Sequence, residues 1–330
     1  MRDRALIFMG VLTIASLAGA PVAGQAPDLQ GIYVNNDATP LNRPKELEGR
    51  PYLTDAEVTE LRTRADRLFK HGDNEAASGD NVFLAALANV DHYQNPSGHS
   101  TAGSPEMTER VFDKRTSLIV DPANGKIPLL TPEGQRRKTA AEAAAHRPIT
   151  GPEDLSGANR CITFGVPRLG GNFGAGVYSY YQILQTPEYV VFLMEAIHEA
   201  RIIPLDGRPH LPPNIRQWTG DSRGRWEGKT LVVDTTNFSP RSDFMGSAEN
   251  LHLVERFTRI APGTLKYEIT VDDPTTWTKP WTASLRLTQT HEAIYEFACH
   301  EGNYDVMLGM LGAGRADAKA GEDHAKKGSK

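Results

Sequence analysis

The sequence predicts a mainly β fold, in which an antiparallel meander closes into a barrel and a partly helical N-terminal segment wraps against it. From about residue 177 onward, apolar runs of strand length recur with turn signals between them. Residues 265–271 alternate between apolar and polar side chains, as a strand with one buried face requires. A meander of about eight such strands closes into a barrel or stacks as a sandwich. We expect the barrel.

Residues 1–24 have the pattern of a cleavable signal peptide. Arg2 and Arg4 form a positive n-region, residues 5–20 are apolar, and residues 22–24 supply the small side chains required before the cleavage site. The apolar stretch is too short to span a bilayer permanently. A buried N-terminal helix is the alternative, but proline and glycine follow the stretch directly. We expect a periplasmic or secreted protein without a stable membrane anchor.

Two helices are predicted in the segment 25–160, which is otherwise rich in turn-forming residues. Thr54 and Glu57 form a capping box, and apolar residues follow at helical spacing. Thr131 and Pro132 supply an N-cap and a proline at the first position of a second, alanine-rich helix. We expect this segment to pack on the β region.

The β region is expected to span residues 161–314, and a separate hairpin is predicted between residues 115–120 and 126–130. Residues 315–330 show no apolar period, and we expect a disordered tail there. The expected strands are 177–185, 189–195, 200–205, 215–220, 230–236, 251–259, 265–271, 282–288 and 294–300.

Charge and composition limit the classes of partner. The formal net charge is −5, and no block of Lys and Arg occurs outside the tail, which argues against nucleic acid and anionic membranes as partners. Hydrophobic residues make up 39% of the chain, enough to bury a core as one large domain or as a domain with a wrapping segment. A small-molecule ligand or substrate therefore fits best.

Cys161 and Cys299 are the only two cysteines of the chain. In an oxidising compartment, two cysteines far apart in sequence favour one disulfide, which stabilises the fold by roughly 4–5 kcal/mol through loop entropy. A free nucleophilic thiol is the alternative.

Several sequence runs carry a resemblance to known families. Residues 28–33 look like the first strand of lipocalin-like barrels, with Tyr33 in place of the usual tryptophan. The resemblance to a family of uncharacterised secreted bacterial proteins covers residues 160–315. It implies export and a lipocalin-like β architecture, and it implies no particular activity. The runs that carry this second resemblance are 185–195, 201–210, 220–238, 254–257, 272–277 and 298–303.

The densest cluster of reactive side chains is Glu195, His198 and Arg201, where one expected strand ends and the next begins. A hairpin tip there would place carboxylate, imidazole and guanidinium groups at the barrel rim, an arrangement suited to acid/base chemistry. Solvated side chains at a hairpin tip are the alternative. The spacing lacks the His-Glu-x-x-His pattern of helical zinc sites.

A second cluster, His300 and Glu301, follows the second cysteine. A disulfide would fix His300, and strand alternation would turn it to the same face as Glu296. If His198, His210 and His300 share one interior, they form a proton-transfer site or a divalent metal site.

Charged residues also interrupt strands that are otherwise apolar. Neighbouring residues of a strand face opposite sides, so one of Glu255 and Arg256 should point inward, where it needs an ionic partner. Asp234 also interrupts an apolar strand, so it either points inward and needs a partner or points outward into solvent. Outward, solvated side chains are likewise the alternative for Glu255 and Arg256. Aromatic residues such as Trp218 and Phe238 either line a ligand pocket or pack within the core.

The sequence thus predicts an exported β-barrel enzyme that performs acid/base chemistry on a small, partly apolar organic molecule, as a lyase, isomerase or hydrolase. His198 and His300 would transfer protons, Glu195 and Glu301 would act as bases or orient them, and Arg201 would bind an anionic group. The alternative is a non-catalytic periplasmic small-molecule binding or carrier protein that uses the same cavity. The sequence has no Gly-x-Ser-x-Gly elbow and no nucleotide-binding glycine loop.

Overall fold

The expected signal peptide lies outside the residues that the structure, a computed structural model, describes. Within those residues, no helix is both long enough and apolar enough to cross a membrane. The described residues are 27–70, 77, 80–94, 110–166 and 180–328.

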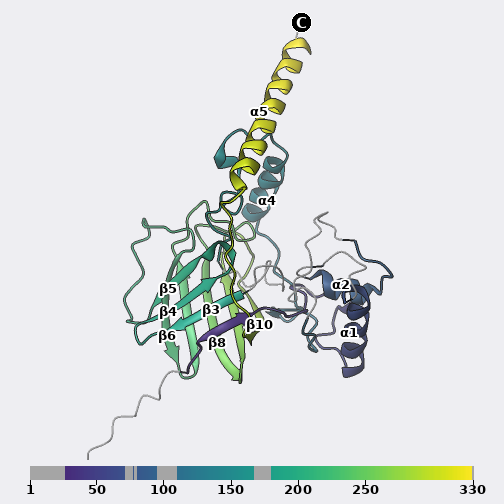
Figure 1. The fold of residues 1–330 in the computed structure, drawn as a ribbon, viewed down its shortest axis with the longest axis vertical. Helices are drawn as coiled ribbons and strands as arrows, with labels where there is room; N and C mark the ends of the chain where they lie inside the picture. The colour runs from purple at the N-terminus through teal and green to yellow at the C-terminus, as the bar shows by residue number, and fades with distance from the viewer. Residues whose placement is uncertain (1–26, 71–76, 78–79, 95–109, 167–179, 329–330) are drawn as a thin grey trace, which may run out of the picture.

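A 10-stranded antiparallel sheet forms the body of the protein (Figure 1). The strands follow the order β5-β4-β3-β1-β10-β9-β8-β7-β6, and β2 pairs with β10 off this path. Their bounds are β1 Gly31–Val34, β2 Ile119–Asp121, β3 Tyr180–Gln185, β4 Tyr189–Met194, β5 Ala200–Pro204, β6 Asp221–Glu227, β7 Thr230–Thr236, β8 His252–Ala261, β9 Thr264–Asp272 and β10 Trp281–Thr290.

The sheet is strongly curved, but the described residues do not close it with a hydrogen-bonded ladder. No pairing joins the two edge strands, β5 and β6, so the predicted barrel is not confirmed. The edges still lie close together, because a Cβ atom added to Gly224 of β6 would stand 2.9 Å from Cγ2 of Ile203 in β5. A glycine in a strand often marks such a close approach. The mainly β, antiparallel architecture agrees with the sequence.

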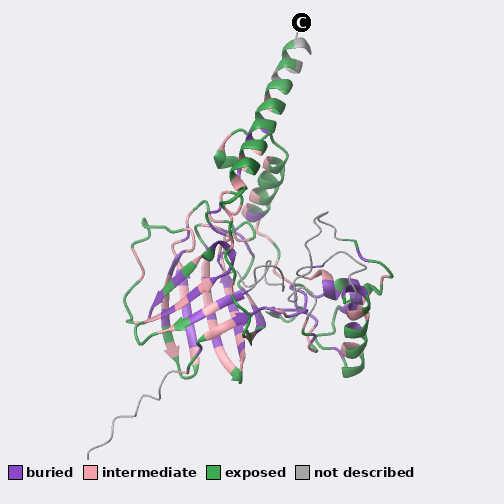
Figure 2. Ribbon diagram, in the orientation of Figure 1, coloured by how far each residue is buried: buried purple, intermediate pink, exposed green. Residues whose placement is uncertain are grey.

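The main hydrophobic core lies on the inner face of this curved sheet (Figure 2). Alternate residues of each strand point into it, as β9 shows most clearly. Its four inward side chains have no exposed surface, whereas the residues between them are partly exposed, so the predicted alternation is confirmed. These four side chains are Leu265, Tyr267, Ile269 and Val271.

The N-terminal segment both joins the sheet and forms a helical lobe beside it (Figure 1). Strand β1 is inserted between β3 and β10, so this segment does more than wrap around the β region. Helix α1, Asp55–Phe69, begins with the predicted capping box. Helix α2, Asn81–Ala88, was not predicted, since its N-cap residue makes no side-chain cap bond. The two helices bury a second core that includes Leu61, Leu68, Phe69, Val82, Phe83 and Phe112.

Two expected strands and one expected hairpin do not form. Residues 215–220 and 294–300 contain no strand. The predicted hairpin of residues 115–130 is also wrong, because β2 pairs with β10 and Leu130 forms a bridge with Trp277. In each case the local apolar pattern is present, but the partner strand is decided by tertiary packing.

The predicted alanine-rich helix is confirmed as α4, Pro132–Ala145, with the Thr131 hydroxyl accepting a hydrogen bond from the Gly134 amide at 3.0 Å. The expected disordered tail is wrong for residues up to 328, because α5, Asn303–Gly328, extends away from the sheet (Figure 1). Alanine, lysine and glutamate favour helix even without an apolar period. The absence of an apolar period in residues 315–330 indicates only that little of this helix is buried.

Candidate functional site

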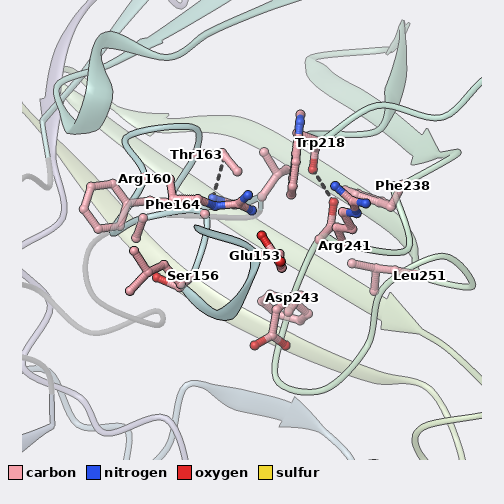
Figure 3. A pocket seen from close by; sticks show the side chains of 17 residues that line it. Glu153, Ser156, Arg160, Thr163, Phe164, Trp218, Phe238, Arg241, Asp243 and Leu251 are labelled. Carbon is pink, nitrogen blue, oxygen red and sulfur yellow. Dashed lines mark hydrogen bonds between the residues drawn. The ribbon is translucent and has the colours of Figure 1, made fainter. Parts of the chain in front are cut away.

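A cavity of about 450 Å³ lies at one end of the sheet, next to the C-terminal end of β7 and the N-terminal end of β8. Three loops line this cavity: residues 153–166, Trp218 of the β5–β6 connection, and residues 238–251 of the β7–β8 connection (Figure 3). We call it the loop-covered cavity. Its volume falls within the range of about 300–1,000 Å³ that is typical of small-molecule sites.

The loop of residues 153–166 is tied down by the disulfide between Cys161 and Cys299, which confirms the pairing predicted from the sequence. Asn303, at the start of α5, donates from its side chain to the backbone carbonyl of Asn159 at 2.8 Å. The wall of the cavity is therefore attached to the C-terminal segment both covalently and by a hydrogen bond.

A second attachment joins the same loop to the sheet. The Thr163 hydroxyl donates to the Glu199 carboxylate at 2.8 Å, directly before β5, and it also accepts a hydrogen bond from the Gly165 amide. Beneath the loop, Phe238 and Leu251 belong to the main hydrophobic core and form an apolar floor. The cavity thus opens onto the end of the core.

Arg160 is the most deeply placed charged side chain of the cavity. It is half-buried, whereas Arg241, Glu153 and Asp243 are exposed at the rim. Its guanidinium carbon lies 5.9 Å from the centre of the Trp218 ring, within cation–π range, and Figure 3 shows the side chain extending across the cavity. The Arg160 Nε atom is buried without a hydrogen-bond partner among the described residues.

The residues predicted to perform acid/base chemistry are not brought together at this cavity. His198, His300 and Glu301 are exposed, and Glu195 is buried beside the short helix η4, Ala196–His198. The predicted strand orientation of His300 is wrong, because the chain leaves the sheet at the end of β10 and reaches the disulfide as a coil.

Arg201, predicted to bind an anionic group, binds an internal carboxylate instead. Its Nη1 and Nη2 atoms donate to the two carboxylate oxygens of Glu255 at 3.1 and 2.6 Å. The Tyr267 hydroxyl donates to the same carboxylate at 2.5 Å. Burial, followed by the charge of Glu255, raises the pKa of Tyr267 well above its usual value. Glu255 is thus the inward residue of the pair considered above, and Arg256 faces outward and binds Glu227.

On the outer face of the sheet, two histidines and two aspartates form a hydrogen-bonded chain. His210 Nδ1 lies 2.9 Å from an Asp221 oxygen, and its Nε2 lies 3.0 Å from Asp234. His252 Nε2 lies 3.0 Å from the other Asp234 oxygen. Among the residues that the structure describes, no group of three or more His, Cys, Asp or Glu side chains could hold a metal ion. The proposed metal ligands His198, His210 and His300 therefore gain no support there.

The hydrogen bonds and charges among these four side chains shift the pKa values of Asp234 and His252. Burial alone would raise the pKa of Asp234, but hydrogen bonds and charge from His252 and His210 outweigh burial and lower it. The hydrogen bond to Asp234 raises the pKa of His252 above its usual value of 6.5, with further help from Asp272. Protonated His252 is therefore favoured by the folded state.

We expect this pair to make stability fall as the pH rises. Because the folded state raises the pKa of His252, its contribution is complete below about pH 6.5 and is lost as the pH rises through the folded-state value. The change should stay below about 1 kcal/mol, since His252 is 41% exposed and exposed pairs are screened by solvent. Urea unfolding of the parent protein and His252→Asn between about pH 5.5 and pH 8 measures it. His291→Asn, at an exposed site, is the control, and equal pH slopes in all three proteins would contradict the prediction.

The sequence did not single out Arg160 or Arg241, because both lie in irregular loops whose proximity depends on the folded sheet. Trp218 and Phe238 were among the aromatic residues considered for a pocket, and both line the cavity. No family model, curated protein or solved structure matches the chain.

Proposed function

We propose that this protein is an exported binding or carrier protein that holds a small organic molecule in the loop-covered cavity without converting it. The observation that carries the proposal is the cavity itself, which has the volume of a ligand site, an apolar floor and a half-buried arginine. Among the described residues that line it, none is a histidine, so the general acid most common in enzymes is absent from that lining.

Three observations support the exported, lipocalin-like form of this proposal. The N-terminal pattern of residues 1–24 is that of a signal peptide, and the Cys161–Cys299 disulfide suits an oxidising compartment. The close approach of β5 and β6 supports a barrel-like enclosure with its ligand at one end.

An acid/base enzyme is the second candidate, and the hydrogen-bonded histidines and aspartates on the outer face of the sheet favour it. His210 is held between two carboxylates, and an imidazole oriented in this way can exchange protons with a bound molecule. A lyase, isomerase or hydrolase would use such a group, with His252 as its neighbour through Asp234. Neither His210 nor His252 lines the loop-covered cavity or the cavity beside α4, which is why we place the enzyme second.

A thermal-shift screen with small organic molecules tests the binding function. A ligand present at about 100 times its Kd should stabilise the protein by about 2.7 kcal/mol. Ala158→Trp would fill the cavity and abolish this stabilisation, whereas Ala145→Trp, on the exposed end of α4, would leave it unchanged. The proposal fails if no compound stabilises the parent protein or if both tryptophan variants respond alike.

Turnover separates the two candidates. Any ligand found by the screen is incubated with the protein and recovered for mass spectrometry. A carrier returns the ligand unchanged, whereas an enzyme yields a product whose formation is lost in His210→Gln. Product formation would overturn the non-catalytic proposal.

A further inference from the structure

We infer that the ligand of the loop-covered cavity is a planar aromatic carboxylate whose carboxylate group is bound by Arg160. This inference rests on the proposed binding function and names the chemical class of the ligand. It depends on three features of the cavity: the unused donors of Arg160, the distribution of charge with depth, and the shape and polarity of the floor.

The guanidinium of Arg160 has donors that no other described residue uses. Arginine carries five N–H donors, and no hydrogen bond or ion pair joins the Arg160 side chain to another described residue. Its Nε atom is buried, and an unsatisfied buried donor destabilises a folded protein by about 1–3 kcal/mol. An acceptor supplied by a ligand would remove this penalty.

Trp218 limits the directions open to those donors. The guanidinium carbon lies 5.9 Å from the centre of the indole ring, so the ring covers one side of the group, and the N–H donors lie along the edge of the planar guanidinium. A carboxylate matches this edge with two parallel hydrogen bonds, which a neutral carbonyl or hydroxyl group does not. The geometry therefore favours a planar anion over a neutral polar group.

The charges of the lining are separated by depth. Glu153 and Asp243 are exposed at the rim, and Asp243 already accepts a hydrogen bond from the Gly246 amide at 2.9 Å. Arg241 is exposed as well and, among the described residues, has no carboxylate partner. The deepest charge is that of Arg160, so an anionic group lies most favourably at the inner end.

The floor of the cavity suits an aromatic ring. Phe238 and Leu251 are almost fully buried parts of the main core, and the half-buried rings of Phe164 and Phe244 also line the cavity. Aromatic ligands gain both buried apolar area and ring–ring contacts on such a surface. A ring on this floor with its carboxylate at Arg160 uses both features at once.

Matched probes test the inference by isothermal titration calorimetry. We expect 2-naphthoate to bind the parent protein about 10-fold to 100-fold more tightly than 2-naphthamide, which has the same ring but no charge. Octanoate, which has the charge but no ring, should also bind more weakly than 2-naphthoate. Equal affinity for naphthoate and naphthamide would overturn the anionic part of the inference, and equal affinity for octanoate would overturn the aromatic part.

Arginine variants test the role assigned to Arg160. Arg160→Gln should weaken 2-naphthoate binding by about 10-fold to 100-fold and leave 2-naphthamide binding unchanged, whereas Arg160→Lys should restore part of the loss. Arg225→Gln, an exposed position of β6 outside the cavity, is the control. Unchanged naphthoate affinity in Arg160→Gln would overturn the inference.

The possible failures remain distinguishable. The comparison of the three probes in the parent protein does not depend on whether a variant folds. If naphthamide binds as well as naphthoate and Ala158→Trp abolishes both, the ligand class is wrong but the binding function stands. If neither probe nor any compound of the thermal-shift screen binds, the proposed function itself fails.

Discussion

Replacing Glu255 with leucine is expected to destabilise the protein by about 3–5 kcal/mol, the largest effect that we predict for a single substitution. The change would leave Arg201 charged and without its carboxylate partner inside the curved sheet. The side chains of the pair are only 7% and 1% exposed, so water cannot take the place of the missing partner. The Tyr267 hydroxyl would lose its acceptor at the same time.

The neighbouring position provides a matched control for this prediction. Arg256 follows Glu255 in β8 but points to the outer face, where it binds Glu227 at 2.8 Å. The two side chains of this outer pair are 38% and 39% exposed, so Arg256→Gln should cost less than about 1 kcal/mol. Urea unfolding followed by circular dichroism measures both variants. Similar losses in the two variants would show that the buried pair contributes no more than the exposed one.

A double substitution separates loss of the pair from loss of one partner. Arg201→Met with Glu255→Leu removes both charges and leaves apolar side chains of similar size. Replacing a buried ion pair in this way is often neutral or stabilising, so we expect the double variant to recover most of the stability lost by Glu255→Leu. If the double variant is as unstable as the single one, the loss comes from packing or from the Tyr267 hydroxyl, which lacks its acceptor in both variants, and not from the unpaired charge.

Signals that lie within a few residues of each other were read correctly from the sequence. The capping box of Thr54 and Glu57 and the N-cap at Thr131 are local, and so is the alternation of β9. The inward position of Glu255 was only half predicted. Alternation required one inward charge in β8, but the identity of its partner depended on how the sheet curves, which brings Arg201 of β5 opposite β8.

The error at His300 has a different origin. The cysteine pairing was predicted correctly, yet the strand assigned to residues 294–300 does not form. Strand β10 pairs with β1 as far as Thr290, and within the described residues no strand pairs with the chain beyond that residue. A strand needs a neighbour to satisfy its backbone, and sequence pattern alone does not reveal whether one is present.

The loop-covered cavity was not predictable from motifs. Arg160 and Arg241 stand in separate loops without any spacing signal, and they line one cavity only because the disulfide and the β7–β8 connection place them there. The histidines were predicted as site residues because the imidazole group is reactive, but the reactivity of a side chain does not determine where the fold places it. The aromatic residues Trp218 and Phe238 were useful hints, since both line the cavity and Trp218 lies within cation–π range of Arg160.

Removal of the disulfide is expected to have the second large effect, about 5 kcal/mol in the free energy of unfolding. The value follows from the entropy of closing a loop between cysteines 138 residues apart. Replacing Cys161 and Cys299 with serine together avoids a new unpaired thiol. Urea unfolding of this double variant, compared with the parent protein under non-reducing conditions, measures the loss. A loss below about 1 kcal/mol would show that the unfolded chain is already compact without the disulfide.

The same variant also connects stability to binding. Cys161 follows Arg160 directly, so removal of the disulfide takes away the covalent link between the loop of residues 153–166 and the C-terminal segment, while the hydrogen bonds to Glu199 and Asn303 stay. We expect 2-naphthoate affinity to fall even at temperatures where the variant remains folded, because Arg160 must be ordered again on binding. Asn303→Ala keeps the disulfide and removes the hydrogen bonds from the Asn303 side chain to the Asn159 carbonyl and to Cys161 Sγ, so it should reduce affinity much less. If the two variants bind equally well, the disulfide stabilises the fold without positioning Arg160.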